Sequence, residues 1–207
     1  MALSITPRHT FPKLPLALYE SHVIAGAESS TGDPFTIVVG LDKSLAEKLK
    51  TLSGNTDDAE LAKTSDRERF VTGSYEEWYQ GKDRTLFALI HQESGRLAAL
   101  AWFGPKPFGR KSLKHLSDEE RGENERAMKN EGWHTVVYRS YAPFRGTGLM
   151  KDFVRFAMKQ YATAYPEAKF WAGIFSDGNP ASLGLAKALG FVEKNVSDQG
   201  ETILVKV

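Results

Sequence analysis

The fold of this chain is decided by the stretch Tyr141-Ala142-Pro143-Phe144-Arg145-Gly146-Thr147-Gly148-Leu149-Met150. It closes a β-branched segment, residues 133–142, that predicts a strand, and it opens an apolar pattern typical of an amphipathic helix over 146–164. The first N–H groups of such a helix lack intrahelical partners, and the helix dipole favours an anion there by roughly 0.3–2 kcal/mol. The stretch therefore predicts an anion socket, although glycine at a strand-to-helix turn also serves packing alone.

A second pattern lies nearer the C-terminus. A short apolar strand is predicted at 170–174, and Asn179 and Pro180 are the residue types favoured at the N-cap and first position of a helix. Gly190 is a typical residue just past the end of that helix. Two further strand patterns, 191–196 and 202–207, predict a closing hairpin. The order is strand, glycine turn, helix, strand, Asn-capped helix and hairpin.

This order resembles the GNAT superfamily of acyl-CoA-dependent N-acyltransferases. In that superfamily a motif Arg/Gln-x-x-Gly-x-Gly/Ala wraps the CoA pyrophosphate, and the chain has Arg145-Gly146-Thr147-Gly148-Leu149-Met150, with Met150 in place of the small final residue. A second family signature, Asn followed by an apolar helix and Leu-Gly-Phe, is matched by residues 179–191. The resemblance spans residues 84–207, with support from the strand pattern that begins at Phe35.

The resemblance implies an α/β (α+β) fold with a mixed, mostly antiparallel central sheet flanked by helices, and acetyl-CoA as the acyl donor. It also implies that the strand at 133–142 and the strand at 170–174 splay apart, so that the pantetheine arm pairs with backbone groups of the first. A helix cap alone explains Asn179 equally well. The cofactor-binding residues implied by the family are Tyr138, Arg139, Ser140, Arg145, Gly146, Thr147, Gly148, Leu149, Met150 and Asn179.

The implied reaction is direct attack of a primary amine on the thioester, with backbone donors near Tyr138 stabilising the oxyanion. Deprotonating a lysine-like amine at pH 7 costs about 4–5 kcal/mol, whereas an α-amino group costs only about 1 kcal/mol, so the need for a general base depends on the acceptor. Many relatives carry a glutamate where this chain has Ile174, and a tyrosine acid where it has Ala186. The family's two usual proton-transfer groups are therefore missing.

We expect His134 to replace the base, because imidazole titrates near neutrality and His134 begins the strand that carries Tyr138. A histidine beside a tryptophan is also a common structural residue. Tyr138, Glu77, Asp177 and water relays compete for the role. The predicted catalytic residues are His134 and Tyr138.

Composition restricts the other functions. The 207 residues carry a formal net charge of +1, so no basic field attracts nucleic acid, and the absence of cysteine excludes disulfides and thiolate zinc sites. The five histidines never fall into metal-ligand spacing, so we predict no metal.

The run from Gly104 to Ser112 resembles a phosphate-binding loop, but it has Arg110 where that loop requires lysine. No apolar run reaches a membrane span, and we expect a soluble, cytoplasmic protein.

The predicted organisation is an N-terminal arm over 1–34, with a possible strand at 16–24, and an acyltransferase domain over 35–207 with a charged insertion at about 104–132. Residues 56–80 and the insertion would line the acceptor side, where excess acid favours a cationic amine. The acceptor is expected to be a small-molecule or peptide amine, and monomer and homodimer both remain open. The rival hypothesis is a catalytically silent acyl-CoA-binding sensor or interaction module.

Overall fold

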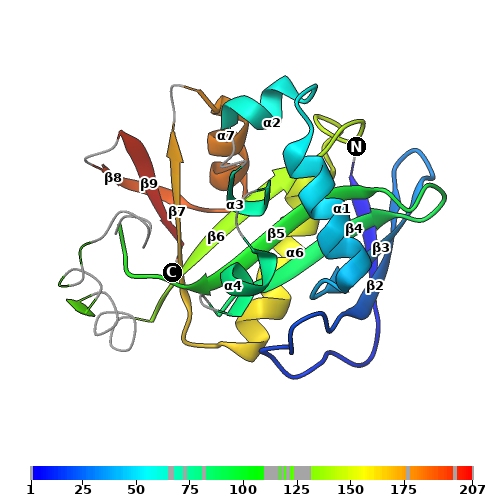
Figure 1. The fold of residues 1–207 in the computed structure, drawn as a ribbon, viewed down its shortest axis with the longest axis horizontal. Helices are drawn as coiled ribbons and strands as arrows, with labels where there is room; N and C mark the ends of the chain where they lie inside the picture. Colours follow the sequence, from blue (N-terminus) through cyan, green and yellow to red (C-terminus); the bar gives the residue numbers. More distant parts are fainter. Residues whose placement is uncertain are drawn as a thin grey trace. The chain divides into compact units, whose positions relative to one another are not determined.

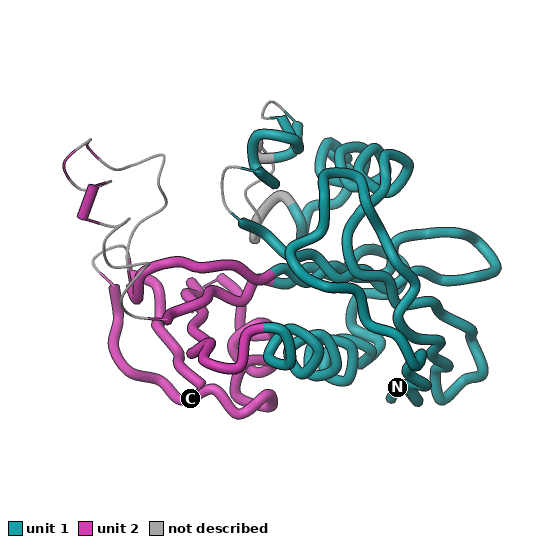
Figure 2. Tube along the Cα trace, turned by 90° about the horizontal axis from the view of Figure 1, so that it is seen from below, with its two compact units in different colours: residues 1–102, 138–164 teal, residues 103–137, 165–207 magenta. Residues whose placement is uncertain are grey.

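The structure is a computed structural model that describes residues 2–64, 68–71, 74–80, 83–109, 117, 119, 122–123, 132–175, 178–197 and 200–206. The chain forms two compact units, the first made of Met1–Trp102 and Tyr138–Ala164 and the second of Phe103–Val137 and Tyr165–Val207 (Figure 2). Two strands, β5 (Leu97–Pro105) and β6 (Trp133–Ser140), pass from one unit into the other. Each unit is described by itself below.

The first unit is built on an antiparallel meander. β1 to β5 lie in chain order, and the ladders β1–β2, β2–β3 and β3–β4 are all antiparallel. Leu86 lies on one face of β4, and Phe87 and Leu89 lie on the other. All three side chains are fully buried, so both faces of the sheet must be covered. Besides β5, the strands are β1 (Leu3–Pro7), β2 (His22–Ser29), β3 (Pro34–Val39) and β4 (Thr85–His91).

Helices cover the two faces of this sheet. The long helix α6 (Leu149–Ala164) packs on one face, and the four helices that follow β3 lie over the other (Figures 1 and 2). Buried Leu149, Phe153 and Tyr161 form the predicted apolar stripe of α6. The four helices are α1 (Lys43–Gly54), α2 (Ala59–Thr64), α3 (Glu68–Val71) and α4 (Tyr75–Gln80).

Two of these helices begin after a side chain that caps the helix. Asp42 caps α1 by accepting a bond from the Leu45 N–H, 2.9 Å away. Ser74 caps α4 by accepting from the Glu77 N–H, at 3.2 Å, as the serine of a Ser-x-x-Glu capping box does. The hydroxyl of Ser74 also donates to the Glu76 carboxylate.

The second unit carries the C-terminal elements. The strand order is β6-β7-β9-β8, with β6 and β7 parallel and the other two ladders antiparallel. Trp171, Ile203 and Val205 form a small core, against which Phe108 and Trp133 pack. The elements are β7 (Lys169–Phe175), α7 (Pro180–Ala188), β8 (Val192–Val196) and β9 (Glu201–Lys206), and α7 packs on β7.

The N-terminal segment differs from expectation. The possible strand at 16–24 lies instead at His22–Ser29, and residues 26–29, expected to be irregular, belong to it. Residues 1–34 also supply β1, and β2 pairs along its length with β3, so the predicted arm is part of the sheet of the first unit. Most of the charged insertion lies outside the described residues, and a single acyltransferase domain over 35–207 stays a prediction.

Candidate cofactor and active site

The glycine turn connects β6 to α6 and needs both of its glycines. Gly146 has φ of 76° and Gly148 has φ of 85°, a left-handed conformation that costs other residues about 1 kcal/mol or more. Because neither residue is helical, α6 begins at Leu149 rather than at the predicted residue 146. The turn starts from a fixed point, since the Tyr141 N–H donates to the Ala98 carbonyl of β5 at 3.0 Å.

The N–H groups of this turn are available to a ligand. Among the described residues, the backbone N–H groups of Gly146, Gly148, Leu149 and Met150 donate to no other group, whereas that of Thr147 donates to the Phe144 carbonyl. A Cβ built on Gly146 would meet no atom within 4 Å, so space is open beside it. These donors lie at the positive end of a 16-residue helix, where the sequence predicts an anion socket.

Side chains hold the turn in place. The ring of Phe144 contacts Phe35, with 5.7 Å between centroids, and His91, at 5.2 Å. The Thr147 hydroxyl donates to the Phe144 carbonyl at 2.6 Å. In the first turn of α6, the Asp152 carboxylate accepts a bond from the Leu3 N–H at 3.0 Å. The turn is thus anchored to β1, β3 and β4 of the same unit.

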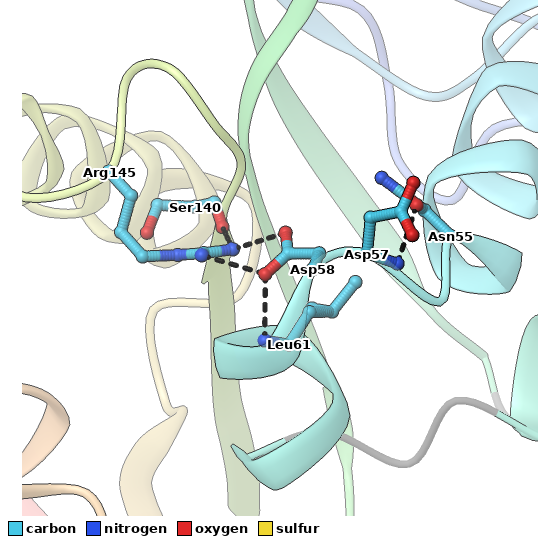
Figure 3. A network of polar contacts seen from close by, with 6 residues as sticks. All are labelled: Asn55, Asp57, Asp58, Leu61, Ser140 and Arg145. Carbon is cyan, nitrogen blue, oxygen red and sulfur yellow. Dashed lines mark hydrogen bonds and ion pairs between the residues drawn. The ribbon is translucent and has the colours of Figure 1, made fainter.

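Arg145 turns its side chain toward α2. Its guanidinium donates two hydrogen bonds to the Asp58 carboxylate, at 2.8 and 2.7 Å, and a third to the Ser140 carbonyl at 3.1 Å (Figure 3). The hydrogen bonds to Asp58 raise the pKa of Arg145 above its ordinary value, more than burial lowers it. Sequence reasoning missed Asp58; its position before α2 indicates a helix cap but gives no sign of a partner 87 positions away.

The resemblance implies that Tyr138, Arg139 and Ser140 of β6 pair with the pantetheine arm through their backbone. The side chains of these three residues lie in different surroundings. Burial raises the pKa of Tyr138 well above its usual value of 10.0. Arg139 is buried, with its guanidinium 5.2 Å from the centroid of Phe70 and 5.3 Å from that of Trp102. The Ser140 carbonyl accepts from Arg145. The side chain of Arg139 is therefore part of the packing around Phe70 and Trp102.

The β6–β7 ladder is short. It has three rows, Trp133 with Lys169, His134 with Phe170 and Thr135 with Trp171, and no further row among the described residues of the two strands. From Phe170 to Phe175, β7 pairs instead with β9 on its other side. The strands thus part soon after they begin, as the resemblance implies.

His134 lies in the paired part of β6. Its ring is half-buried and lies 5.8 Å, between centroids, from the ring of Tyr165, which follows α6 in the chain. Of its competitors, Glu77 is exposed on α4, and Asp177 lies outside the described residues. The general base therefore stays a prediction.

Asn179 caps α7 as expected, because its side-chain oxygen accepts from the Ser182 N–H at 3.1 Å and Pro180 follows it. The amide nitrogen keeps two donors that the cap does not use. Ile174 on β7 and Ala186 on α7 are both buried. The positions at which relatives carry proton-transfer groups are thus apolar here.

Two broader features bear on function. Within the part of the chain that the structure describes, no three histidine, aspartate or glutamate side chains gather where a metal ion would be held. The same residues include no helix that is long and apolar enough to cross a membrane.

Solved structures share this architecture, although no protein-family model and no curated protein matches the sequence. A ribosomal L7/L12 alpha-N-protein acetyltransferase in its apo form superimposes with a TM-score of 0.61 at 15% identity, over 95% of this chain and 99% of that one. The chain has the GNAT fold. A putative acetyltransferase from Acinetobacter baylyi ADP1 has a TM-score of 0.56 at 16% identity, over 86% and 94% of the two chains.

A third GNAT structure contains ligands. It is the spermidine N-acetyltransferase from Vibrio cholerae in complex with CoA and spermine, which has a TM-score of 0.55 at 13% identity and covers 83% of this chain and 92% of that one. The expected GNAT-like fold class, a mixed and mostly antiparallel sheet flanked by helices, is confirmed. At these identities the likeness concerns the fold, so the activity of this chain has to be argued from its own residues.

Proposed function

We propose that the chain is an N-acetyltransferase that transfers an acetyl group from acetyl-CoA to a primary amine. The observation that carries this proposal is the glycine turn: two left-handed glycines and four unpaired N–H groups at the start of α6. Such a turn suits a diphosphate, which accepts several backbone bonds at once and interacts favourably with the helix dipole. The resemblance to the GNAT superfamily implies that such a turn wraps the CoA pyrophosphate, and structural neighbours that contain CoA support the proposal.

In this proposal the diphosphate binds the N–H groups of Gly146 to Met150, and the pantetheine arm pairs with the backbone of Tyr138 to Ser140. The end of the β6–β7 ladder after Thr135 supports this, because a strand beyond its ladder keeps backbone groups that an amide-containing arm can pair with. Asn179 would lie beside the arm and use the amide donors that its cap leaves over.

The amine nitrogen would attack the thioester carbonyl, form the C–N bond, and expel CoA as a thiolate that takes a proton from water. A backbone donor near Tyr138 would stabilise the oxyanion. Since its pKa is raised, the Tyr138 phenol keeps its proton at neutral pH, so it can donate a hydrogen bond but cannot act as the base. His134 would accept the amine proton, directly or through water.

The acceptor would be a cationic small molecule or a peptide amine. Structural neighbours are crystallised with spermine and with kanamycin, and others are named for acetylating ribosomal proteins. On this chain, helices α2 and α4 carry acidic residues in their first turns, Glu60 on α2 and Glu76 and Glu77 on α4. This acidity favours a polyamine-like acceptor over a neutral one.

A second candidate is a binding module that holds acyl-CoA without turning it over. It is favoured by Ile174 and Ala186, whose buried apolar side chains stand where relatives carry a carboxylate and a phenol. Such a protein would bind the cofactor as tightly as an enzyme but would release no thiol.

The test is thiol release from acetyl-CoA across a panel of polyamines, aminoglycosides and peptides with free α-amino groups. Turnover with at least one amine, and none without an amine, supports the acetyltransferase. If acetyl-CoA raises the melting temperature while every amine leaves the thiol signal at the no-amine rate, the binding module is the better description.

A further inference from the structure

The side chain of Arg145 is bound within the network of Figure 3, on Asp58 and Ser140. Both terminal nitrogens of its guanidinium face Asp58, in the parallel two-bond arrangement that arginine and carboxylate prefer, and one of them also donates to the Ser140 carbonyl. One side chain of the turn thus contacts both the end of β6 and the start of α2. All of these residues belong to the first unit.

Asp58 is itself fixed. Its side chain is only 10% exposed, and besides Arg145 it accepts the Leu61 N–H at 3.0 Å, which makes it the N-cap of α2. Its neighbour Asp57 is exposed, and its backbone N–H donates to Asn55. The ion pair therefore joins the glycine turn to the start of α2, and each of the two is also held by other contacts.

We propose that Arg145 is a positioning residue, which Asp58 holds against the end of β6 so that the turn presents its backbone N–H groups to the diphosphate, and that its guanidinium does not itself bind phosphate. This inference rests on the proposed function. Binding phosphate would require the guanidinium to give up two hydrogen bonds to a carboxylate that is largely shielded from water, and Asp58 would lose the opposite charge that Arg145 places beside it. Contacts between Arg145 and phosphate would only replace the hydrogen bonds that Arg145 already makes to Asp58 and Ser140.

The competing role, direct phosphate binding, predicts a different set of mutant effects. If Arg145 positions the turn through Asp58, removing either member disrupts the same contact, so the effects of the two changes do not add. If Arg145 binds phosphate, Asp58 competes with the cofactor, and its removal leaves CoA affinity unchanged or improves it. The variant Arg145→Lys also distinguishes the two roles, because lysine keeps the positive charge that attracts phosphate but cannot make the two parallel hydrogen bonds to Asp58.

The experiment measures acetyl-CoA affinity by calorimetry, at one salt concentration, for the wild type, Asp58→Asn, Arg145→Gln and the double variant. We expect each single change to weaken binding about 5- to 20-fold and the double variant to be no weaker than the worse single one. Arg145→Lys should lose about as much as Arg145→Gln. Asp57→Asn, which removes the same charge one residue away, should bind like the wild type.

A second measurement guards against a general loss of structure. For the same variants, KM should rise for acetyl-CoA but not for acetyl-pantetheine, which lacks the diphosphate that the turn binds. Asp58→Glu keeps the carboxylate and should restore part of the affinity. Unchanged or tighter acetyl-CoA binding by Asp58→Asn, or wild-type affinity in Arg145→Lys, would overturn the inference. If the wild type itself binds no acetyl-CoA, the proposed function fails instead.

Discussion

Phe144 packs its ring edge-on against Phe35, with 5.7 Å between the ring centroids and 75° between the ring planes. Phe35 lies near the start of β3 and is 1% exposed, so the contact ties the glycine turn to the core of the first unit. Aromatic pairs of this kind contribute about 0.5–1.5 kcal/mol beyond the area they bury. The turn that would receive the cofactor is therefore held by packing as well as by its own backbone.

Replacing Phe144 by alanine should weaken acetyl-CoA binding and lower the free energy of unfolding by about 2 kcal/mol, because the turn loses its contact with the core. Urea denaturation and calorimetry measure the two effects. Phe11→Ala is the matched control, since Phe11 is also half-buried and stacks on a core ring, Phe87, away from the turn. The control should lose stability but keep wild-type affinity; equal affinity losses in both variants would contradict the role of Phe144.

The local parts of the site could be predicted from sequence. The Gly-x-Gly pattern and the Asn-Pro pair depend on backbone conformation and on caps within a few residues, and the structure has left-handed glycines at 146 and 148 and a cap at Asn179. The fold class was implied by the resemblance of these motifs and their order to the GNAT superfamily. The bond between Arg145 and Asp58 could not be predicted, because residues 87 positions apart meet only through packing of α2 and the turn on the sheet.

The N-terminal strands show the same limit. Proline and glycine in the first 34 residues suggested an arm, but β1 pairs with β2 and β2 pairs with β3, and Leu14 and Leu16 are buried. Tertiary contacts decide such segments more than local propensity does. The general base could be predicted only as His134 among several competing groups, because its usual positions are apolar and no single polar residue replaces them in the pattern.

Glu76 gives a prediction about acid stability. The Tyr19 hydroxyl donates to its carboxylate, and this bond, with further ones from its own backbone and Ser74, lowers the pKa of Glu76 from 4.5 to about 2. A carboxyl group with a lowered pKa stabilises the fold above its unfolded pKa, and the contribution disappears as pH falls from about 4.5 to about 2. As pH falls over this range, the urea concentration at the midpoint of unfolding should therefore decrease more steeply for the wild type than for Glu76→Gln. Parallel curves would show that the bond contributes nothing.

Arg139 gives a prediction about packing. Because its guanidinium lies close to the rings of both Phe70 and Trp102, Arg139→Lys should lower the free energy of unfolding by about 1–2 kcal/mol, since the planar group stacks on rings better than an ammonium does. Arg155→Lys is the control, because its side chain is 53% exposed and should lose almost nothing. Thermal denaturation of the three proteins decides this; equal stability of both variants would show that the rings do not hold Arg139.

His134 gives a prediction about the pH dependence of the rate. If it accepts the amine proton, His134→Ala and His134→Gln should both lower kcat/KM about 100-fold at pH 7 and approach the wild type toward pH 9, where the amine deprotonates itself more readily. Thiol release across this pH range, with the best acceptor, measures the effect. A variant profile parallel to that of the wild type would mean that His134 is structural, as its contact with Tyr165 alone would suggest.

The most direct test of the central claim is calorimetric titration of acetyl-CoA into the wild type and into Gly148→Trp, with Gly26→Ala as the control in β2. The indole would fill the space in front of the unpaired N–H groups, so the wild type and the control should bind and Gly148→Trp, though folded by circular dichroism, should not. Binding of equal strength by all three proteins would place the cofactor away from the turn and contradict the claim.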